Sequence, residues 1–280
     1  MPRPHTDFLQ SQTLAWQPSR FPHLPGCQVK LLSEDPDSGA QSLIVRFPSG
    51  WATVRPGVLG TGEELLVLEG ALELDGRRFG PDGYGWFPPG SLRTLRAAPD
   101  GAVALVFFDG EPAWTDGAPA AGSKAPVASL IDAFELPWMS EGLELAYGCA
   151  GRRWKALRGA PHTGPATLLI ASAPHLHPPR WCGAQEIHAC AVELFVLSGD
   201  LLSHAGQLCA GAYCWRPAGI AHGPYGSRGG NLAIVRTHGA RFNTELTAYE
   251  IALPRAPEYR PLLPPELRSC AVHPWRPQRY

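Results

Sequence analysis

The most constraining feature of this 280-residue chain is an internal repeat. The segment LGTGEELLVLEGALEL (59–74) aligns with HACAVELFVLSGDLLS (188–203) at an offset of 129 residues. The alignment continues without a gap through DGYGWFPPGSLR and GAYCWRPAGIAH, where Trp86 meets Trp215. Segments upstream match at an offset of 125, and a four-residue insertion within residues 172–181 reconciles the two offsets. This self-similarity predicts two copies of one structural unit that arose by internal duplication.

Each copy consists of short apolar or alternating runs, and glycine- or proline-bearing turns separate these runs every 8 to 12 residues. Such spacing is typical of antiparallel sandwiches and barrels. The 31 glycines and 30 prolines suit many short strands joined by tight turns better than long helices. Helix signals are sparse, and SLIDAFEL (129–136) is the best candidate for a short helix. We therefore expect an all-β protein.

The domain boundaries follow from composition. The segment around residues 111–127 is rich in Ala, Gly and Pro, which is typical of a linker. We expect an N-terminal barrel over 1–112, a linker over 113–127, a C-terminal barrel over 128–252 and an extended, proline-rich tail over 253–280.

Charge and cysteine content narrow the choice of partner and compartment. The formal net charge of −1 argues against nucleic acid, which would need a basic surface excess. The sequence has neither an apolar signal-peptide core nor a run of the roughly 18 apolar residues that a membrane span needs. None of the seven cysteines forms a C-x-x-C pair. We expect a cytoplasmic protein with free thiols and no nucleic-acid or membrane partner.

The second copy carries a recognisable motif, G-x5-P-x-G-x2-H, at Gly211, Pro217, Gly219 and His222. Together with the two β-rich copies, this motif resembles the cupin superfamily, whose members are double-stranded β-helix (jelly-roll) barrels. The segments VKLLSEDPDSGAQSLIVRFPSGW and EIHACAVELFVLSGDL are similar to those of bicupins grouped with ChrR-like and acetylacetone-dioxygenase-like cupins. The resemblance covers nearly the whole chain and implies two tandem cupin barrels.

The resemblance also implies a metal site in the second copy. Counting back from Gly199, Glu186 and His188 occupy the two histidine positions of the family's first motif, and Val192 occupies its glutamate position. Alternation along a strand places Glu186 and His188 on one face, and His222 would approach from a neighbouring strand. Two imidazoles and one carboxylate form a ligand set that suits Fe(II), and Mn(II) or Zn(II) would also accept it. We expect one divalent transition metal here.

Two points stay open around this site. Glu193 follows the glutamate position by one residue, and a one-residue slip turns a side chain to the other face of a strand. Glu193 is therefore either a fourth ligand or nearby hydrogen-bond acceptor, or an outward residue with Val192 facing inward. Candidate substrate contacts, from strands and loops near the predicted barrel mouth, are Tyr213, Arg216, Tyr225, His175 and His177.

The first copy lacks the histidines. Gly57, Leu59 and Arg93 stand at the three histidine positions, while Glu63 keeps the glutamate position. A carboxylate without histidine partners binds a transition metal poorly, so we expect the N-terminal barrel to be metal-free and either to serve assembly or to shape the cleft of the other domain. The alternative for the second copy is structural, with His222 capping a turn.

These features predict a bicupin whose C-terminal barrel binds one divalent metal and a small organic ligand, with oxygenase-like metal chemistry if it is an enzyme. The alternative is a non-catalytic bicupin that senses a ligand or metal, or is purely structural. Exposed sheet edges favour association, and we expect a homodimer.

Overall fold

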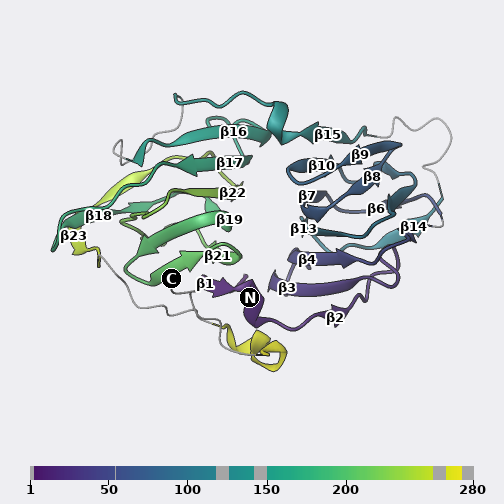
Figure 1. Ribbon diagram of the computed structural model, residues 1–280, viewed down its shortest axis with the longest axis horizontal. Helices are drawn as coiled ribbons and strands as arrows, with labels where there is room; N and C mark the ends of the chain where they lie inside the picture. The colour runs from purple at the N-terminus through teal and green to yellow at the C-terminus, as the bar shows by residue number, and fades with distance from the viewer. Residues whose placement is uncertain (1–2, 54, 118–125, 142–149, 255–262, 273–280) are drawn as a thin grey trace. The chain divides into compact units, whose positions relative to one another are not determined.

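The computed structural model describes residues 3–53, 55–117, 126–141, 150–254 and 263–272 (Figure 1). Contacts divide the chain into two compact units, the first formed by Met1–Pro4 and Ala15–Glu135 and the second by His5–Leu14 and Leu136–Tyr280. In the described ranges, no helix has the length and apolar character that a membrane crossing requires. Residues 118–125 of the predicted linker, and 255–262 and 273–280 of the predicted tail, lie outside the described residues, whereas Trp114–Asp116 of the predicted linker form a strand of the first unit.

The first unit contains one seven-stranded antiparallel sheet and two smaller sheets. The large sheet has the order β15-β10-β7-β13-β4-β3-β2, and the small ones have the orders β11-β6-β14 and β5-β12-β8-β9. The large sheet comprises β2 (Gln17–Pro18), β3 (Gln28–Glu34), β4 (Gln41–Phe47), β7 (Glu63–Gly70), β10 (Gly83–Phe87), β13 (Ala102–Phe108) and β15 (Ser129–Asp132). The small sheets comprise β5 (Trp51–Ala52), β6 (Gly57–Leu59), β8 (Leu72–Leu74), β9 (Arg77–Phe79), β11 (Leu92–Arg93), β12 (Arg96–Ala98) and β14 (Trp114–Asp116). The 3-10 helix η2 (Ala133–Glu135) follows β15.

The second unit repeats this plan. Its large sheet has the order β1-β21-β19-β22-β17-β16, with β20 paired to β19, and β18 pairs with β23. Its strands are β1 (Thr6–Gln10), β16 (Arg153–Arg158), β17 (Thr167–Ser172), β18 (Cys182–Ile187), β19 (Ala191–Ser203), β20 (Gly206–Cys209), β21 (Ala212–Arg216), β22 (Asn231–His238) and β23 (Glu245–Ala252). Two 3-10 helices, η1 (Ser11–Thr13) and η4 (Pro265–Cys270), complete the described elements. Both units are all-β with antiparallel sheets, as the turn spacing predicts.

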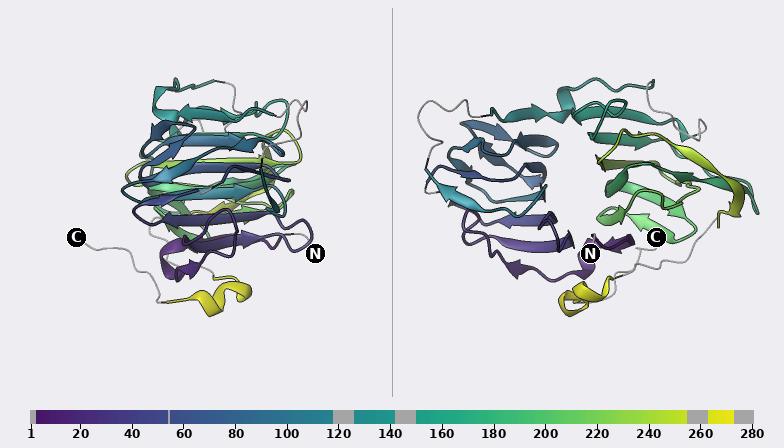
Figure 2. Two further views of the ribbon diagram at one scale, coloured as in Figure 1. Left: turned by 90° about the vertical axis from the view of Figure 1, so that its right-hand side faces the viewer. Right: turned by 180° about the vertical axis from the view of Figure 1, so that it is seen from behind.

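One edge strand of each large sheet comes from the half of the sequence that forms the other unit. The N-terminal strand β1 pairs with β21 of the second unit, while β15, which precedes the second copy, pairs with β10 of the first. The purple strand β1 lies beside the green strands in both Figure 1 and Figure 2. Residues 5–14 and 128–135 thus belong to the opposite unit from the one that the sequence boundaries give them.

The predicted helix over 129–136 is wrong. Residues Ser129–Asp132 form β15, and only Ala133–Glu135 adopt a helical turn, of the 3-10 type. Strand β10 offers an edge whose backbone groups need partners, and β15 supplies them through four paired positions. Leu130 also packs against the core of the first unit. This tertiary pairing outweighs the weak local preference for helix.

The two units agree in register as well as in strand order. Trp86 lies opposite Glu64 in the first unit, and Trp215 lies opposite Glu193 in the second. Both central strands carry a bulge at equivalent places, between the pairings of Val67 and Glu69 in β7 and between those of Val196 and Ser198 in β19. The repeat seen in the sequence is therefore a repeat of hydrogen-bond pattern.

A glycine follows the first buried stretch of each central strand for a physical reason. Gly70 and Gly199 have φ values of +69° and +76°, in the left-handed region. A Cβ on Gly70 would lie 2.3 Å from the carbonyl oxygen of Gly101, and one on Gly199 would lie 2.0 Å from that of Gly230. Only glycine allows this close backbone approach in both units.

Alternation along the central strands sets which residues face the core. Leu65 and Val67 of β7 belong to the apolar core of the first unit. Their counterparts in β19, Leu194 and Val196, contact or belong to a core cluster of the second unit. Residues at the intervening positions point to the opposite face of each sheet.

Candidate metal centre

The candidate site lies in the second unit, where backbone pairing brings two distant segments together. The amide of Glu186 donates to the carbonyl of His222 at 2.8 Å, and the amide of His222 donates back at 3.0 Å. The Pro217–Gly219 turn is hydrogen-bonded to the segment that carries Glu186 and His188, because the Gly219 amide donates to the carbonyl of His188 at 2.9 Å. Glu186 and His188 lie two residues apart, so their side chains share one face.

These three side chains form one compact, buried cluster. One ligand atom from each of Glu186, His188 and His222 lies within 4.8 Å of the others. The two imidazole rings are 4.8 Å apart between centroids. This is the trio that the cupin motif positions predicted, and the structure brings all three together.

The hydrogen bonds of the two histidines leave one ring nitrogen of each available. His188 Nδ1 contacts the carbonyl of Asn243 at 2.7 Å, and His222 Nδ1 contacts that of Ile220 at 3.0 Å. A carbonyl accepts only from a protonated nitrogen, so these contacts assign the proton to Nδ1 and leave Nε2 with its lone pair. Glu186 Oε1 is buried without a hydrogen-bond partner. This donor set fits a divalent transition metal.

Both histidines are held in the neutral form that a metal ligand requires. Burial, followed by the nearby charge of Arg216, lowers the pKa of His222 to about 2. Burial also lowers the pKa of His188, against the opposing effects of the Asn243 carbonyl and Glu186. Both imidazoles are therefore unprotonated at neutral pH.

A cavity of about 70 Å³ adjoins the cluster. The three candidate ligands line it together with Arg216 and Tyr225, two of the predicted substrate contacts. Arg152 also lines it, with Nη1 3.5 Å from Glu186 Oε1. Sequence reasoning missed Arg152, because no motif marks it and its counterpart in the first copy, at the offset of 125, is a cysteine.

Glu193 does not join the cluster. Its carboxylate accepts hydrogen bonds from the Tyr213 hydroxyl at 2.7 Å and from Arg236 Nη1 at 2.7 Å, on the opposite face of β19. Val192 lines the cavity instead. Of the two alternatives for Glu193, the structure has the outward side chain and not the fourth ligand, because the one-residue slip turns it to the other face of the strand.

Three predicted substrate contacts also lie elsewhere. Tyr213 alternates with the inward residue Cys214 and faces Glu193. His175 Nδ1 contacts the carbonyl of Ala173 at 2.7 Å, and the ring of His177 stacks on Trp181 at 3.7 Å. The first copy repeats the tyrosine contact, since the Tyr84 hydroxyl donates to Glu64 at 2.6 Å. Because the tyrosine–glutamate pair recurs in the copy without the candidate metal ligands, the sequence itself indicates that the pair is structural.

A family model described as "Domain of unknown function (DUF4437)" matches residues 17–244. The chain belongs to the DUF4437 family. No curated protein sequence matches this DUF4437 chain significantly.

Solved structures similar to this DUF4437 protein have the cupin fold. A Nostoc punctiforme PCC 73102 protein, described as a "putative dioxygenase", superposes with a TM-score of 0.73 at 19% identity, over 90% of this chain and 92% of its own. A deletion mutant of Bacillus subtilis oxalate decarboxylase gives a TM-score of 0.55 at 12% identity, over 85% of this chain and 78% of its own. The protein Ylba from E. coli gives 0.54 at 17% identity, over 84% and 92%. The chain therefore has the cupin jelly-roll fold.

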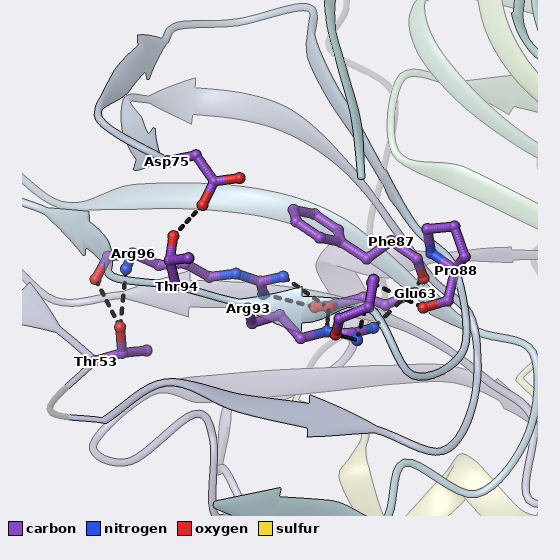
Figure 3. Close-up of polar contacts among 9 residues, drawn as sticks. Thr53, Glu63, Asp75, Phe87, Pro88, Arg93, Thr94 and Arg96 are labelled. Atoms are coloured by element: carbon purple, nitrogen blue, oxygen red, sulfur yellow. Dashed lines mark hydrogen bonds and ion pairs between the residues drawn. The ribbon is translucent and has the colours of Figure 1, made fainter. Parts of the chain in front are cut away.

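In the first unit of this DUF4437 chain, an ion pair fills the equivalent place. Glu63 accepts a hydrogen bond from Arg93 Nε at 3.0 Å and two from Arg96, both at 2.9 Å (Figure 3). All three side chains are buried. Burial opposes ionisation of Glu63, yet Arg96 and Arg93 hold its pKa at about 2.

The other two histidine positions of the first unit are closed as well. Gly57, the counterpart of Glu186, lies against the indole of Trp114, and a Cβ there would approach Trp114 Cζ2 to 2.1 Å. Leu59, the counterpart of His188, is fully buried in the apolar core. Neither position offers a metal ligand.

Proposed function

We propose that this protein is a bicupin whose C-terminal barrel binds one divalent transition metal through Glu186, His188 and His222, together with a small organic ligand. The observation that carries the proposal is the buried cluster in which one ligand atom from each of Glu186, His188 and His222 lies within 4.8 Å of the others. Backbone carbonyls orient both imidazoles before any metal arrives, which is the arrangement that metal-ligating histidines use.

The chemistry that we propose is oxygenase-like. Two histidines and one carboxylate leave open positions on the metal, and a bound Fe(II), Mn(II) or Zn(II) would supply Lewis acidity, with oxygen chemistry if it is iron. The protein's part is to hold the ligand beside the cluster. Val192 and Phe242 give the cavity apolar walls, and Tyr225 and Arg216 supply polar groups. The Nostoc punctiforme protein and oxalate decarboxylase, by their descriptions, support an enzyme of this general kind.

We assign the N-terminal barrel a structural role. Arg93 and Arg96 already neutralise Glu63, and the Trp114 ring lies over Gly57. A metal there would have to displace a buried ion pair, and none of the three motif positions that hold ligands in the second unit carries an imidazole in the first, where Gly57, Leu59 and Arg93 stand. One metal per chain is therefore the expected stoichiometry.

Elemental analysis of purified, untagged protein tests the proposal. We expect close to one equivalent of iron, manganese or zinc, and loss of most of it in the His188→Ala and His222→Ala variants. His162→Ala is the matched control, because His162 is an exposed histidine of the same unit. Wild-type protein that stays metal-free after anaerobic reconstitution with each of the three ions would refute the metal site.

Oxygen consumption by the loaded protein then separates enzyme from binding module. We expect uptake in the presence of a suitable small organic substrate, and none in the His222→Ala variant. Stoichiometric metal with no turnover over a broad substrate panel would favour a bicupin that binds or senses its ligand without chemistry.

A further inference from the structure

The cavity beside the candidate metal centre carries an excess of positive charge. Two arginines, Arg152 and Arg216, line it, whereas Glu186 is the one carboxylate among its described lining residues. Arg152 lies 3.5 Å from Glu186 and so partly neutralises it. A divalent ion in the cluster would add two further positive charges. The cavity therefore lacks negative charge, with or without a metal.

Arg216 is the cavity-lining cation that forms no ion pair with any of the described residues. Its side chain is 6% exposed, and no described carboxylate lies within ion-pair distance of it. Its Nη2 donates to the backbone carbonyl of Asp7 at 3.3 Å, and its Nε is buried without a hydrogen-bond partner. A buried guanidinium has five donors to satisfy, and leaving its charge uncompensated is costly.

The contact to Asp7 fixes where Arg216 lies. Asp7 belongs to β1, which pairs with β21, the strand that ends at Arg216. The alternate residues of β21 place Arg216 on the same face as Cys214, toward the core and cavity. The backbone carbonyl of Asp7 in β1 thus fixes one end of the Arg216 guanidinium.

The size of the cavity limits what can neutralise this charge. By the same measure of volume one water needs about 10–15 Å³, so 70 Å³ accommodates a ligand of roughly five or six non-hydrogen atoms. The walls beside the cluster are apolar and include Leu194, Val235 and Phe242. A short carbon chain would contact these walls while a charged end meets the arginine.

We propose that the C-terminal cavity selects a short-chain carboxylic acid, whose carboxylate is bound by Arg216 next to the Glu186–His188–His222 cluster. This inference rests on the proposed function, of which it names the substrate class. Arg216 supplies planar, paired donors that match a carboxylate. Arg152 acts as a positioning residue, since it contacts Glu186.

The direct test compares a charged ligand with a neutral one of the same shape. Isothermal titration of zinc-loaded protein with pyruvate and with its amide, pyruvamide, isolates the carboxylate charge. We expect at least tenfold tighter binding of pyruvate. Equal binding of the two, or binding of neither with metal present, overturns the inference and leaves the metal site standing.

Variants then locate the charge that is responsible. Arg216→Met should remove the preference for pyruvate while the zinc content stays near one equivalent, and Arg216→Lys should keep part of it. Arg153→Met is the matched control, since Arg153 neighbours Arg152 but is exposed. An Arg216→Met protein that folds, holds zinc and still prefers pyruvate tenfold would exclude Arg216 as the anchor.

A failure of the proposed function gives a different pattern. If wild-type protein takes up no metal, the same titration on metal-free protein still compares pyruvate with pyruvamide. Preference for pyruvate there, lost in Arg216→Met, would support the anion site without the metal. No preference there would overturn both proposals.

Discussion

Neutralising Glu63 provides a sharp test of how the first unit is held together. Glu63 is 1% exposed and accepts three hydrogen bonds from Arg93 and Arg96. The Glu63→Gln variant keeps the side-chain shape but leaves two buried guanidinium groups beside each other without a counter-charge. Both the lost ion pairs and the remaining like-charge repulsion destabilise the folded state.

Two routes give a consistent magnitude. Removing one partner of a buried ion pair costs about 3–5 kcal/mol. The difference between a pKa of about 2 in the folded protein and the ordinary 4.5 corresponds to about 3 kcal/mol of stability from ionised Glu63. We therefore expect Glu63→Gln to lower the free energy of unfolding by about 3 kcal/mol at pH 7.

The assay is urea-induced unfolding followed by tryptophan fluorescence. Glu69→Gln is the matched control, because Glu69 lies on the same strand but is exposed, and we expect a change within about 0.5 kcal/mol. The Glu63→Gln/Arg93→Met double variant should recover at least part of the loss, since it removes one uncompensated charge. Metal content should stay unchanged in all three.

The effect has a defined pH dependence. The folded-state pKa of Glu63 is depressed, so its contribution is fully present above about pH 4.5 and is lost as the pH falls toward about 2. The stability difference between wild type and Glu63→Gln should shrink through that window. A difference below 1 kcal/mol at pH 7, or one that does not change down to pH 2, would refute the reasoning.

Two further pairs of variants test other parts of the structure. Gly57→Ala should destabilise the first unit by about 1–3 kcal/mol, because the new Cβ would collide with Trp114. Gly60→Ala is the control, since a Cβ at Gly60 would meet open space. Equal melting temperatures for the two variants would contradict this prediction. Glu193→Gln should leave the metal content of the purified protein unchanged while Glu186→Gln lowers it, and metal loss in the Glu193 variant would restore that residue as a ligand.

Much of the candidate site follows from the sequence, because its positions depend on short spacings. Glu186 and His188 share a face through strand alternation, and the Pro-x-Gly turn sets the distance from Gly211 to His222. The register of the repeat also predicts that Trp86 and Trp215 occupy equivalent places, and the two sheets confirm this. The homodimer and the cytoplasmic location stay predictions.

Other features escape prediction because they depend on contacts between distant residues. Arg152 precedes β16 and lies 3.5 Å from Glu186 of β18, 34 positions later in the chain, and no local pattern marks this contact. The sequence leaves the face of Glu193 open because a single-residue slip reverses it, and it wrongly predicts Tyr213 as a substrate contact. A hydrogen bond between the two side chains, at 2.7 Å, shows that they share the face away from the cavity.

The sequence by itself determined that this chain is a pair of similar β-rich units and that one of them brings two histidines and a carboxylate together. Turn chemistry, strand alternation and motif spacing are local, so they can be recognised without a structure. Only the tertiary structure decided that β1 and β15 complete the opposite sheets and that Arg216 is buried with no carboxylate of the described residues within ion-pair distance. The first outcome depends on which strand pairs with the free edge of each sheet. The second depends on which charged side chains are buried without an ion pair. Contacts between residues far apart in the chain determine both.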